Sequence, residues 1–151
     1  MEKKNIISLS GELASGKGTV SKLLAEELNY TIYRNGEYAR TLAKEKGLDI
    51  TSFNEYLNEH PEIDRQIEKS AAEYAEEHND FIIDARLGWY AVPESFKVYL
   101  TVDSSKFDKV AFSIICPLSK IDVIVTDKKP DAKWMETFRR LNIQCLYPKE
   151  I

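Results

Sequence analysis

Nine residues near the amino terminus have the types and spacing of a loop that binds phosphate. They join the apolar run 6–9 to a segment in which Val20, Leu24 and Leu28 recur at helical spacing. Glycine lets the backbone curl so that successive N–H groups point at one anion, and the next helix directs its positive end at the same place. The sequence therefore predicts phosphate binding by residues 11–19, which read G-E-L-A-S-G-K-G-T.

Lys17 is the charged residue of this loop that can reach a terminal phosphate. Its ammonium group is predicted to contact the β and γ phosphates of ATP, so Lys17 is a predicted catalytic residue as well as a ligand of ATP. Gly18 stands where many such loops carry the hydroxyl that binds Mg²⁺, and Thr19, which follows, is the predicted Mg²⁺ ligand. The simplest alternative is a tight strand-to-helix turn that only requires glycine, but it gives Lys17 no role. The residues expected to bind ATP are Gly11, Ala14, Ser15, Gly16, Lys17, Gly18 and Thr19.

Asp84 is a second candidate for the chemistry of phosphate. It follows the apolar run 81–83, which is typical of a buried parallel strand. In a doubly wound sheet, ligands bind at the carboxyl ends of the strands, so this carboxylate is expected near the loop. We predict that Asp84 is a catalytic residue that helps to hold Mg²⁺ through water.

Alternating strand and helix signals predict how these groups are positioned. Short apolar runs predict strands at residues 6–9, 31–33, 81–84, 96–102, 121–126 and 143–147. The intervening segments are too long for hairpins and carry helical periodicity, including helices expected from about Ser105 and from Pro130. A possible capping box at Ser52 and Glu55 opens a short helix. These signals favour an α/β fold with a three-layer parallel sheet, formed by one domain over residues 1–151.

Composition narrows the classes of partner. The chain has 25 acidic and 21 basic residues, a formal net charge of −4, and no basic stripe, so nucleic acid is not an expected partner. Because no apolar segment has the length of a signal peptide or a membrane span, we expect a cytoplasmic protein without a membrane partner. Cys116 and Cys145 lack the spacing of a zinc or redox motif and are expected to be small buried hydrophobes.

Five segments of the first part occur in the order found in one enzyme family. They are residues 11–19, 36–40, 61–65, 84–89 and 96–103. Residues 1–103 resemble the cytidylate-kinase-like nucleoside monophosphate kinases, which have a P-loop NTPase-like fold. The resemblance implies an expected strand order 2-3-1-4, with two further strands beside the fourth.

The same resemblance implies an acceptor site. In that family, arginines at the positions of Arg40 and Arg86 hold the acceptor monophosphate, so Gly36, Arg40 and Arg86 are expected to bind substrate, here CMP or a similar nucleotide. Guanidinium forks suit an anion held beside the γ-phosphate, and positioning is most of the catalysis, so Arg86 is also expected to be catalytic. For Arg40, a solvated helix residue paired with Glu37 is the open alternative.

The remainder of the chain departs from this family. A kinase of this type continues into a lid that bears arginines, whereas residues 102–112, 116–122 and 125–127 resemble the end of the effector domain of DeoR-type sugar-phosphate-sensing repressors. In those regulators a lysine at the position of Lys106 lies near the sugar-phosphate pocket. The glycine-rich turn of that pocket and the helix-turn-helix are missing here, so we expect Lys106 to be a solvated residue in the first turn of a helix.

These two resemblances predict a chimera, by design or recombination, in which residues 104–151 add Rossmann-like β-α units to a kinase-like sheet. The leading hypothesis is an ATP-binding domain in which phosphoryl transfer to CMP is reduced or lost because the lid arginines are missing. An active ATP:CMP phosphotransferase is one alternative. A recombined fold without selected activity, whose loop binds phosphate passively, is the other.

Overall fold

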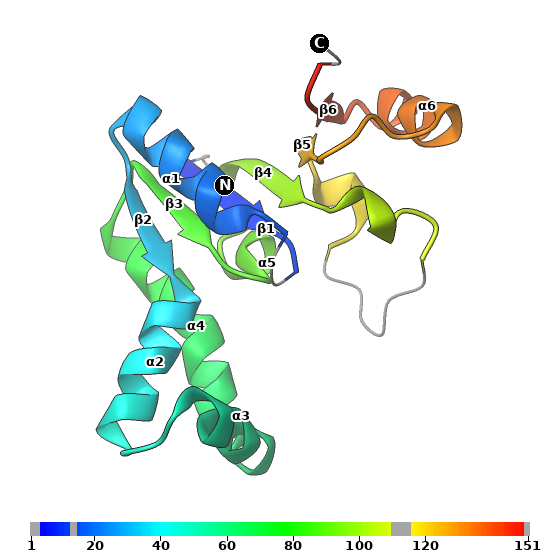
Figure 1. Cartoon of the computed structure of the whole chain (residues 1–151). Coiled ribbons are helices and arrows are strands. Elements are labelled where there is room, and N and C mark those ends of the chain that lie inside the picture. The colour runs from blue at the N-terminus through cyan, green and yellow to red at the C-terminus, as the bar shows by residue number, and fades with distance from the viewer. Residues whose placement is uncertain (1–3, 13–14, 110–115, 150–151) are drawn as a thin grey trace.

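The structure is a computed structural model that describes residues 4–12, 15–109 and 116–149. It contains a parallel six-stranded sheet in the order β2-β3-β1-β4-β5-β6 (Figure 1). The expected strand order and α/β class are therefore confirmed. The strands are β1 (Lys4–Ser10), β2 (Thr31–Arg34), β3 (Phe81–Asp84), β4 (Ser95–Thr101), β5 (Val123–Val125) and β6 (Gln144–Leu146).

Helices cover the two faces of the sheet unequally. Side chains alternate along β1, so Leu9 packs against α1 (Lys17–Leu28), whereas Ile6 packs with residues of α4 (Pro61–Glu77) on the other face. The short helix α5 (Gly88–Ala91) and α6 (Ala132–Arg140) share the face of α4. The described parts of the connections that add strands toward β6 therefore lie over one face, and α1 lies on the opposite face.

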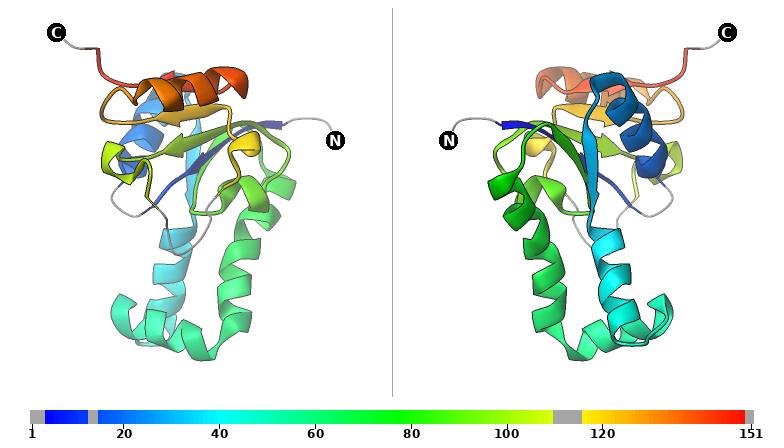
Figure 2. Two further views of the ribbon diagram at one scale, coloured as in Figure 1. Left: turned by 90° about the vertical axis from the view of Figure 1, so that its right-hand side faces the viewer. Right: turned by 90° about the vertical axis from the view of Figure 1, so that its left-hand side faces the viewer.

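Three helices form a projection beyond the sheet, here called the helical projection. It consists of α2 (Asn35–Glu45), α3 (Ile50–Glu59) and α4, and Figure 2 shows α2 and α4 extending together from the sheet with α3 at their far end. Ala43, Phe53 and Ile67, one from each helix, are buried against one another. The projection thus has its own small apolar core and is attached to the sheet at the end of β2, which leads into α2, and at the start of β3, which follows α4.

Two local predictions are wrong. Asp49, not Ser52, caps α3, because the Asp49 carboxylate accepts hydrogen bonds from the N–H group of Ser52 at 2.9 Å and from its hydroxyl at 3.1 Å. The helix expected from about Ser105 is a single 3₁₀ turn, η1 (Ser104–Lys106), within residues 104–109. Asp108 has a φ angle of 58°, in the left-handed region, which ends helical geometry there.

Residues 104–109 and 116–149 form the C-terminal unit, which contains η1, η2 (Leu118–Lys120), β5, α6 and β6. Its core includes Ile124 and Phe138, each 1% exposed. Helix α6 begins at Ala132, two residues after Pro130, with Asp131 as its cap.

The two cysteines, Cys116 and Cys145, pack against this core but are half-buried, whereas the sequence predicted buried side chains. Burial raises the pKa of both thiols, and that of Cys116 rises to about 11. Among the described residues, no helix has the length and apolarity needed to cross a membrane.

Candidate functional site

The predicted phosphate loop joins β1 to α1 at the carboxyl edge of the sheet. A Cβ atom on Gly11, which has a φ angle of 150°, would lie 2.5 Å from the carbonyl oxygen of Thr101, so this approach of β4 requires glycine. Ser15 Oγ lies 2.8 Å from Thr101 Oγ1, which ties the loop to the end of β4. Gly16, with a φ angle of 87°, is the residue before α1. Ala14, a predicted ligand residue, lies outside the described residues.

The first turn of α1 provides donors and a cation at the loop. No side chain caps this helix in the described part of the chain, and the N–H groups of Thr19 and Val20 donate to the carbonyl oxygen of Gly16, each at 3.1 Å. The positive end of the helix therefore faces the loop without a side-chain acceptor, an arrangement that favours an anion. Lys17 Nζ donates to the carbonyl oxygens of Gly11, at 2.8 Å, and Glu12, at 2.7 Å. Burial lowers the pKa of Lys17, and the nearby charge of Asp84 opposes that shift.

Asp84 lies where the sequence predicted it, at the end of β3 beside the loop. Its Oδ2 atom is 3.3 Å from the Ser21 hydroxyl, which donates to it, and 3.5 Å from Arg34 Nε. Ser21 is one turn after Lys17 on α1, and Arg34 ends β2 in register with Asp84. The carboxylate is thus held from both sides by neighbouring elements.

The donor set at this edge fits the Mg²⁺ expected for a bound nucleotide. Thr19 is exposed on the first turn of α1, and among the described residues no side-chain partner occupies its hydroxyl. Asp84 Oδ1, unlike Oδ2, has no hydrogen-bond partner in the described part of the chain. Mg²⁺ keeps several waters and takes one or two protein oxygens together with phosphate oxygens. Thr19 and Asp84 are therefore suitable ligands, one direct and one through water.

The predicted acceptor residues lie on two segments that follow neighbouring strands: Gly36 and Arg40 are on α2, which follows β2, and Arg86 is in the turn after β3. Arg40 lies over Gly36, because a Cβ atom on that glycine would be 3.6 Å from Arg40 Nη1. Arg86 is exposed in the turn after β3, and its charge acts on both Lys17 and Glu68. Neither guanidinium group forms an ion pair or hydrogen bond with the described residues. Glu37 pairs with Arg34, at 3.3 Å, so the alternative partner considered for Arg40 is engaged elsewhere.

Several residues of this edge were missed by sequence reasoning. Ser21 and Arg34 contact Asp84, and Thr101 supports the loop. The sequence does contain a pattern that points to them. Ser21 is four residues after Lys17, on the same helix face. Arg34 ends β2, which flanks β3, and Thr101 ends β4, which flanks β1. Their positions could have been inferred once the strand order was known.

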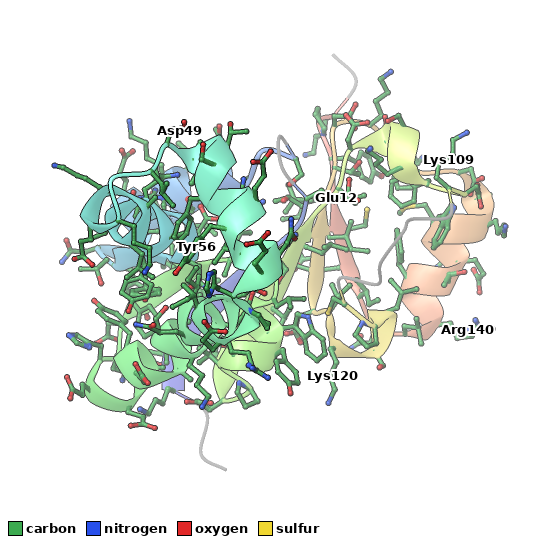
Figure 3. The ribbon with its side chains drawn as sticks, turned by 90° about the horizontal axis from the view of Figure 1, so that it is seen from below. Glu12, Asp49, Tyr56, Lys109, Lys120 and Arg140 are labelled. Carbon is green, nitrogen blue, oxygen red and sulfur yellow. The ribbon has the colours of Figure 1, made fainter. Side chains whose placement is uncertain are left out.

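Lys106 also differs from its expected surroundings. Its Nζ atom is 3.5 Å from Glu12 Oε2, so it forms an ion pair with the phosphate loop, although it is still half-exposed. Figure 3 shows Glu12 between the helical projection, which carries Asp49 and Tyr56, and the C-terminal unit, which carries Lys109 and Arg140. The C-terminal unit thus reaches the candidate site through this lysine.

Comparison with known proteins agrees with this geometry. A family model described as an AAA domain matches residues 7–107. The chain belongs to this family. A cytidylate kinase from Archaeoglobus fulgidus is 35% identical over 107 residues, which are 70% of this chain and 59% of that enzyme. A second cytidylate kinase, from Thermoplasma volcanium, is 35% identical over 99 residues, 62% of this chain and 52% of that enzyme.

The similarity to these relatives covers only part of their length. The chain spans between 45% and 59% of the length of seven archaeal cytidylate kinases to which it is similar. An uncharacterized protein from Eubacterium ventriosum, known from a crystal structure, aligns with a TM-score of 0.54 at 15% identity, over 91% of this chain and 97% of that one. At that identity the likeness concerns the fold alone. Together these findings establish a nucleotide-binding, P-loop kinase-like protein with an α/β fold.

Proposed function

We propose that this protein binds ATP with Mg²⁺ in the phosphate loop and holds CMP or a similar monophosphate at the helical projection. We further propose that phosphoryl transfer between them is much slower than in a kinase with an arginine-bearing lid. The observation that carries the nucleotide assignment is the uncapped first turn of α1, with Lys17 bonded to the loop and Asp84 beside it. This is the donor arrangement that a triphosphate requires.

The acceptor assignment is supported by two unpaired guanidinium groups. Arg40 and Arg86 come from different elements, α2 and the turn after β3, and neither is engaged by the described residues. Two guanidinium groups that follow neighbouring strands are therefore available to an anion. A planar guanidinium binds a phosphate with two parallel hydrogen bonds, which fixes its orientation for in-line transfer.

The slow transfer is argued from the residues that follow β4. The sequence has no arginine between Arg86 and Arg139, and Arg139 pairs with Glu136 on α6. Helix α6 ends next to the start of β6, so Arg139 and Arg140 lie at the edge of the sheet opposite the loop. The cationic residues in the eight positions after β4 are two lysines, Lys106 and Lys109. An arginine that stabilises the transition state contributes about 10³- to 10⁵-fold in rate, and a lysine lacks its fork.

We also propose that the chain joins two lineages after β4. The family model ends at residue 107, and the cytidylate kinase from Archaeoglobus fulgidus matches 70% of this chain. The C-terminal unit has a core of its own, with Ile124 and Phe138 at its centre. A DeoR-like origin for that unit, by recombination or design, rests on the sequence resemblance.

Calorimetric titration with ATP and Mg²⁺, followed by a coupled assay of ADP release with CMP, tests the proposed function. We expect ATP to bind, with binding reduced about 100-fold by Lys17→Ala because several charge-assisted hydrogen bonds are lost. The matched control is Lys22→Ala, an exposed lysine on the same helix. We expect slow turnover that Lys17→Ala abolishes.

The possible outcomes separate the alternatives. Turnover at the 1–100 s⁻¹ typical of kinases would contradict the slow transfer and establish an active ATP:CMP phosphotransferase. An absence of heat and of any thermal shift with ATP would contradict nucleotide binding and leave passive anion binding by the loop.

A further inference from the structure

The contact between the C-terminal unit and the phosphate loop depends on one turn of 3₁₀ helix. This turn, η1, follows β4 directly and carries Lys106, whose Nζ atom is 3.5 Å from Glu12 Oε2. A carboxylate on a loop that receives a triphosphate opposes binding by like-charge repulsion. Among the described residues, the Lys106 ammonium group is the ion-pair partner of the Glu12 carboxylate.

The position of η1 is fixed from outside the segment that the family model matches. Asp127, which follows β5, accepts hydrogen bonds from the Ser104 N–H group to Oδ1, at 2.6 Å, and from the Ser104 hydroxyl to Oδ2, at 3.0 Å. The N–H group of Val102 also donates to the carbonyl oxygen of Val125, at 3.0 Å. The ends of β4 and β5 are therefore bonded together immediately before η1.

Within the turn itself, Asp103 completes the arrangement. Its carboxylate accepts from the N–H group of Ser105 at 2.9 Å and caps η1. Hydrogen bonds from Ser104 lower the pKa of Asp127, and those from Ser105 lower the pKa of Asp103, so both are ionised at neutral pH. Asp103 shapes the turn, whereas Asp127 anchors it to the neighbouring strand.

We propose that Asp127 is a positioning residue for nucleotide binding: through Ser104 it holds η1 so that Lys106 neutralises Glu12 and the loop keeps its affinity for phosphate. This inference rests on the proposed ATP site. It gives the C-terminal unit, which lies almost entirely outside the family match, a defined part in that site. Asp127 acts at a distance, without touching the nucleotide.

The test is calorimetric titration of ATP with Mg²⁺ at low ionic strength against matched variants. Asp127→Ala and Lys106→Ala are each expected to weaken binding about two- to fivefold, the range of an exposed ion pair, and the difference is expected to shrink at high salt. Asp127→Asn is expected to keep most of the affinity because its amide oxygen still accepts from Ser104. Asp131→Ala, which removes the cap of α6, is the control and is expected to leave affinity unchanged.

The deciding measurement repeats these titrations in a Glu12→Gln background. Once Glu12 carries no charge, neither Asp127→Ala nor Lys106→Ala is expected to change ATP affinity. A general structural loss would persist in that background, so an undiminished effect of Asp127→Ala there would overturn the proposal. An unchanged affinity of Asp127→Ala in the original background would overturn it as well.

A spectroscopic reading separates this inference from the proposed function. In ¹⁵N-labelled protein without nucleotide, Asp127→Ala and Lys106→Ala are expected to shift the Glu12 amide resonance in the same direction, whereas Asp131→Ala leaves it in place. If ATP does not bind the unaltered protein, the proposed function fails. An unmoved Glu12 resonance in both variants contradicts the positioning role whether or not ATP binds.

Discussion

The family-matched part of the sheet and the C-terminal unit use their polar residues differently. In the matched part, Arg40 and Arg86 have no partner among the described residues, and Gly11 takes a backbone conformation that brings the loop against β4. In the C-terminal unit, the carboxylates of Asp127 and Asp131 accept N–H groups of that unit at 2.6 and 2.9 Å, and Asp122 accepts the N–H group of Val98 in β4 at 2.8 Å. The first region leaves two guanidinium groups available for a ligand, and the second uses these carboxylates to secure its own backbone and its border with β4.

This difference indicates where a change affects binding and where it affects folding. Both regions share one parallel sheet, joined between β4 and β5. A substitution in the C-terminal unit should reduce stability and spare the nucleotide site, except at the η1 contact. A substitution in the loop should do the reverse unless it disturbs the contact with β4.

Phe138→Ala is expected to have the largest effect on stability. Phe138 is 1% exposed in the C-terminal core, and truncation of a buried phenylalanine costs about 3–5 kcal/mol in the free energy of unfolding. Chemical denaturation measures this loss, and titration of the folded variant with ATP should give the affinity of the unaltered protein. A large loss of ATP affinity in the folded variant would contradict the claim that the C-terminal core affects stability but not nucleotide binding.

Gly11→Ala is the corresponding change in the first region. Its Cβ atom would lie 2.5 Å from two Thr101 atoms and the residue would keep a strained φ angle, so we expect a loss of about 2–3 kcal/mol together with loss of ATP binding. Denaturation and calorimetry on the same sample report both effects. Gly47→Ala, which has a φ angle of 68° and open space around it, is the control for backbone strain alone.

Arg86→Ala sharpens the comparison at the acceptor site. Removal of this unpaired guanidinium group is expected to weaken CMP binding about tenfold, because a hydrogen bond to a charged group is lost, with little change in stability. Equilibrium titration with CMP gives the first value and thermal unfolding the second. Arg65→Ala, on the surface of α4, is the matched control, and an equal loss there would argue against a specific role for Arg86.

The smallest expected effect concerns pH. The pKa of Asp127 lies below its ordinary value of 3.8 in the folded chain, so the stabilisation it provides is present above pH 3.8 and is lost as the pH falls through the lowered pKa. The melting temperature of the unaltered protein should therefore exceed that of Asp127→Asn at neutral pH, and the two should converge in acid. A constant difference over the whole pH range would contradict the hydrogen bonds to Ser104.

Much of this architecture could be predicted from the sequence because its signals are local. The loop glycines, the apolar runs and Asp84 at the end of a run identify β1, β3 and the edge at which ligands bind. The cap of α3 was misassigned because Asp49 and Ser52 are both good capping residues, and only the start of the helix distinguishes them.

The contacts made across the fold could not be predicted in this way. The turn at Asp108, the ion pair of Lys106 with Glu12 and the bonds of Arg34 and Ser21 to Asp84 each join residues whose proximity depends on strand order. Phe107 packs with Trp134 and Phe138, and this tertiary contact favours the 3₁₀ turn over the helix that the local pattern predicts. Local helix propensity is a weak guide to secondary structure where tertiary packing of this kind determines the conformation.

The order of strands from β1 outward has a consequence for how such a chain can arise. From β4 to β6, sequence order equals spatial order, and the described parts of both connections lie over the same face. The last two strands can therefore be exchanged at a single seam, with no rethreading of the backbone that precedes them. Such an exchange would leave β1 to β4 and their register unchanged.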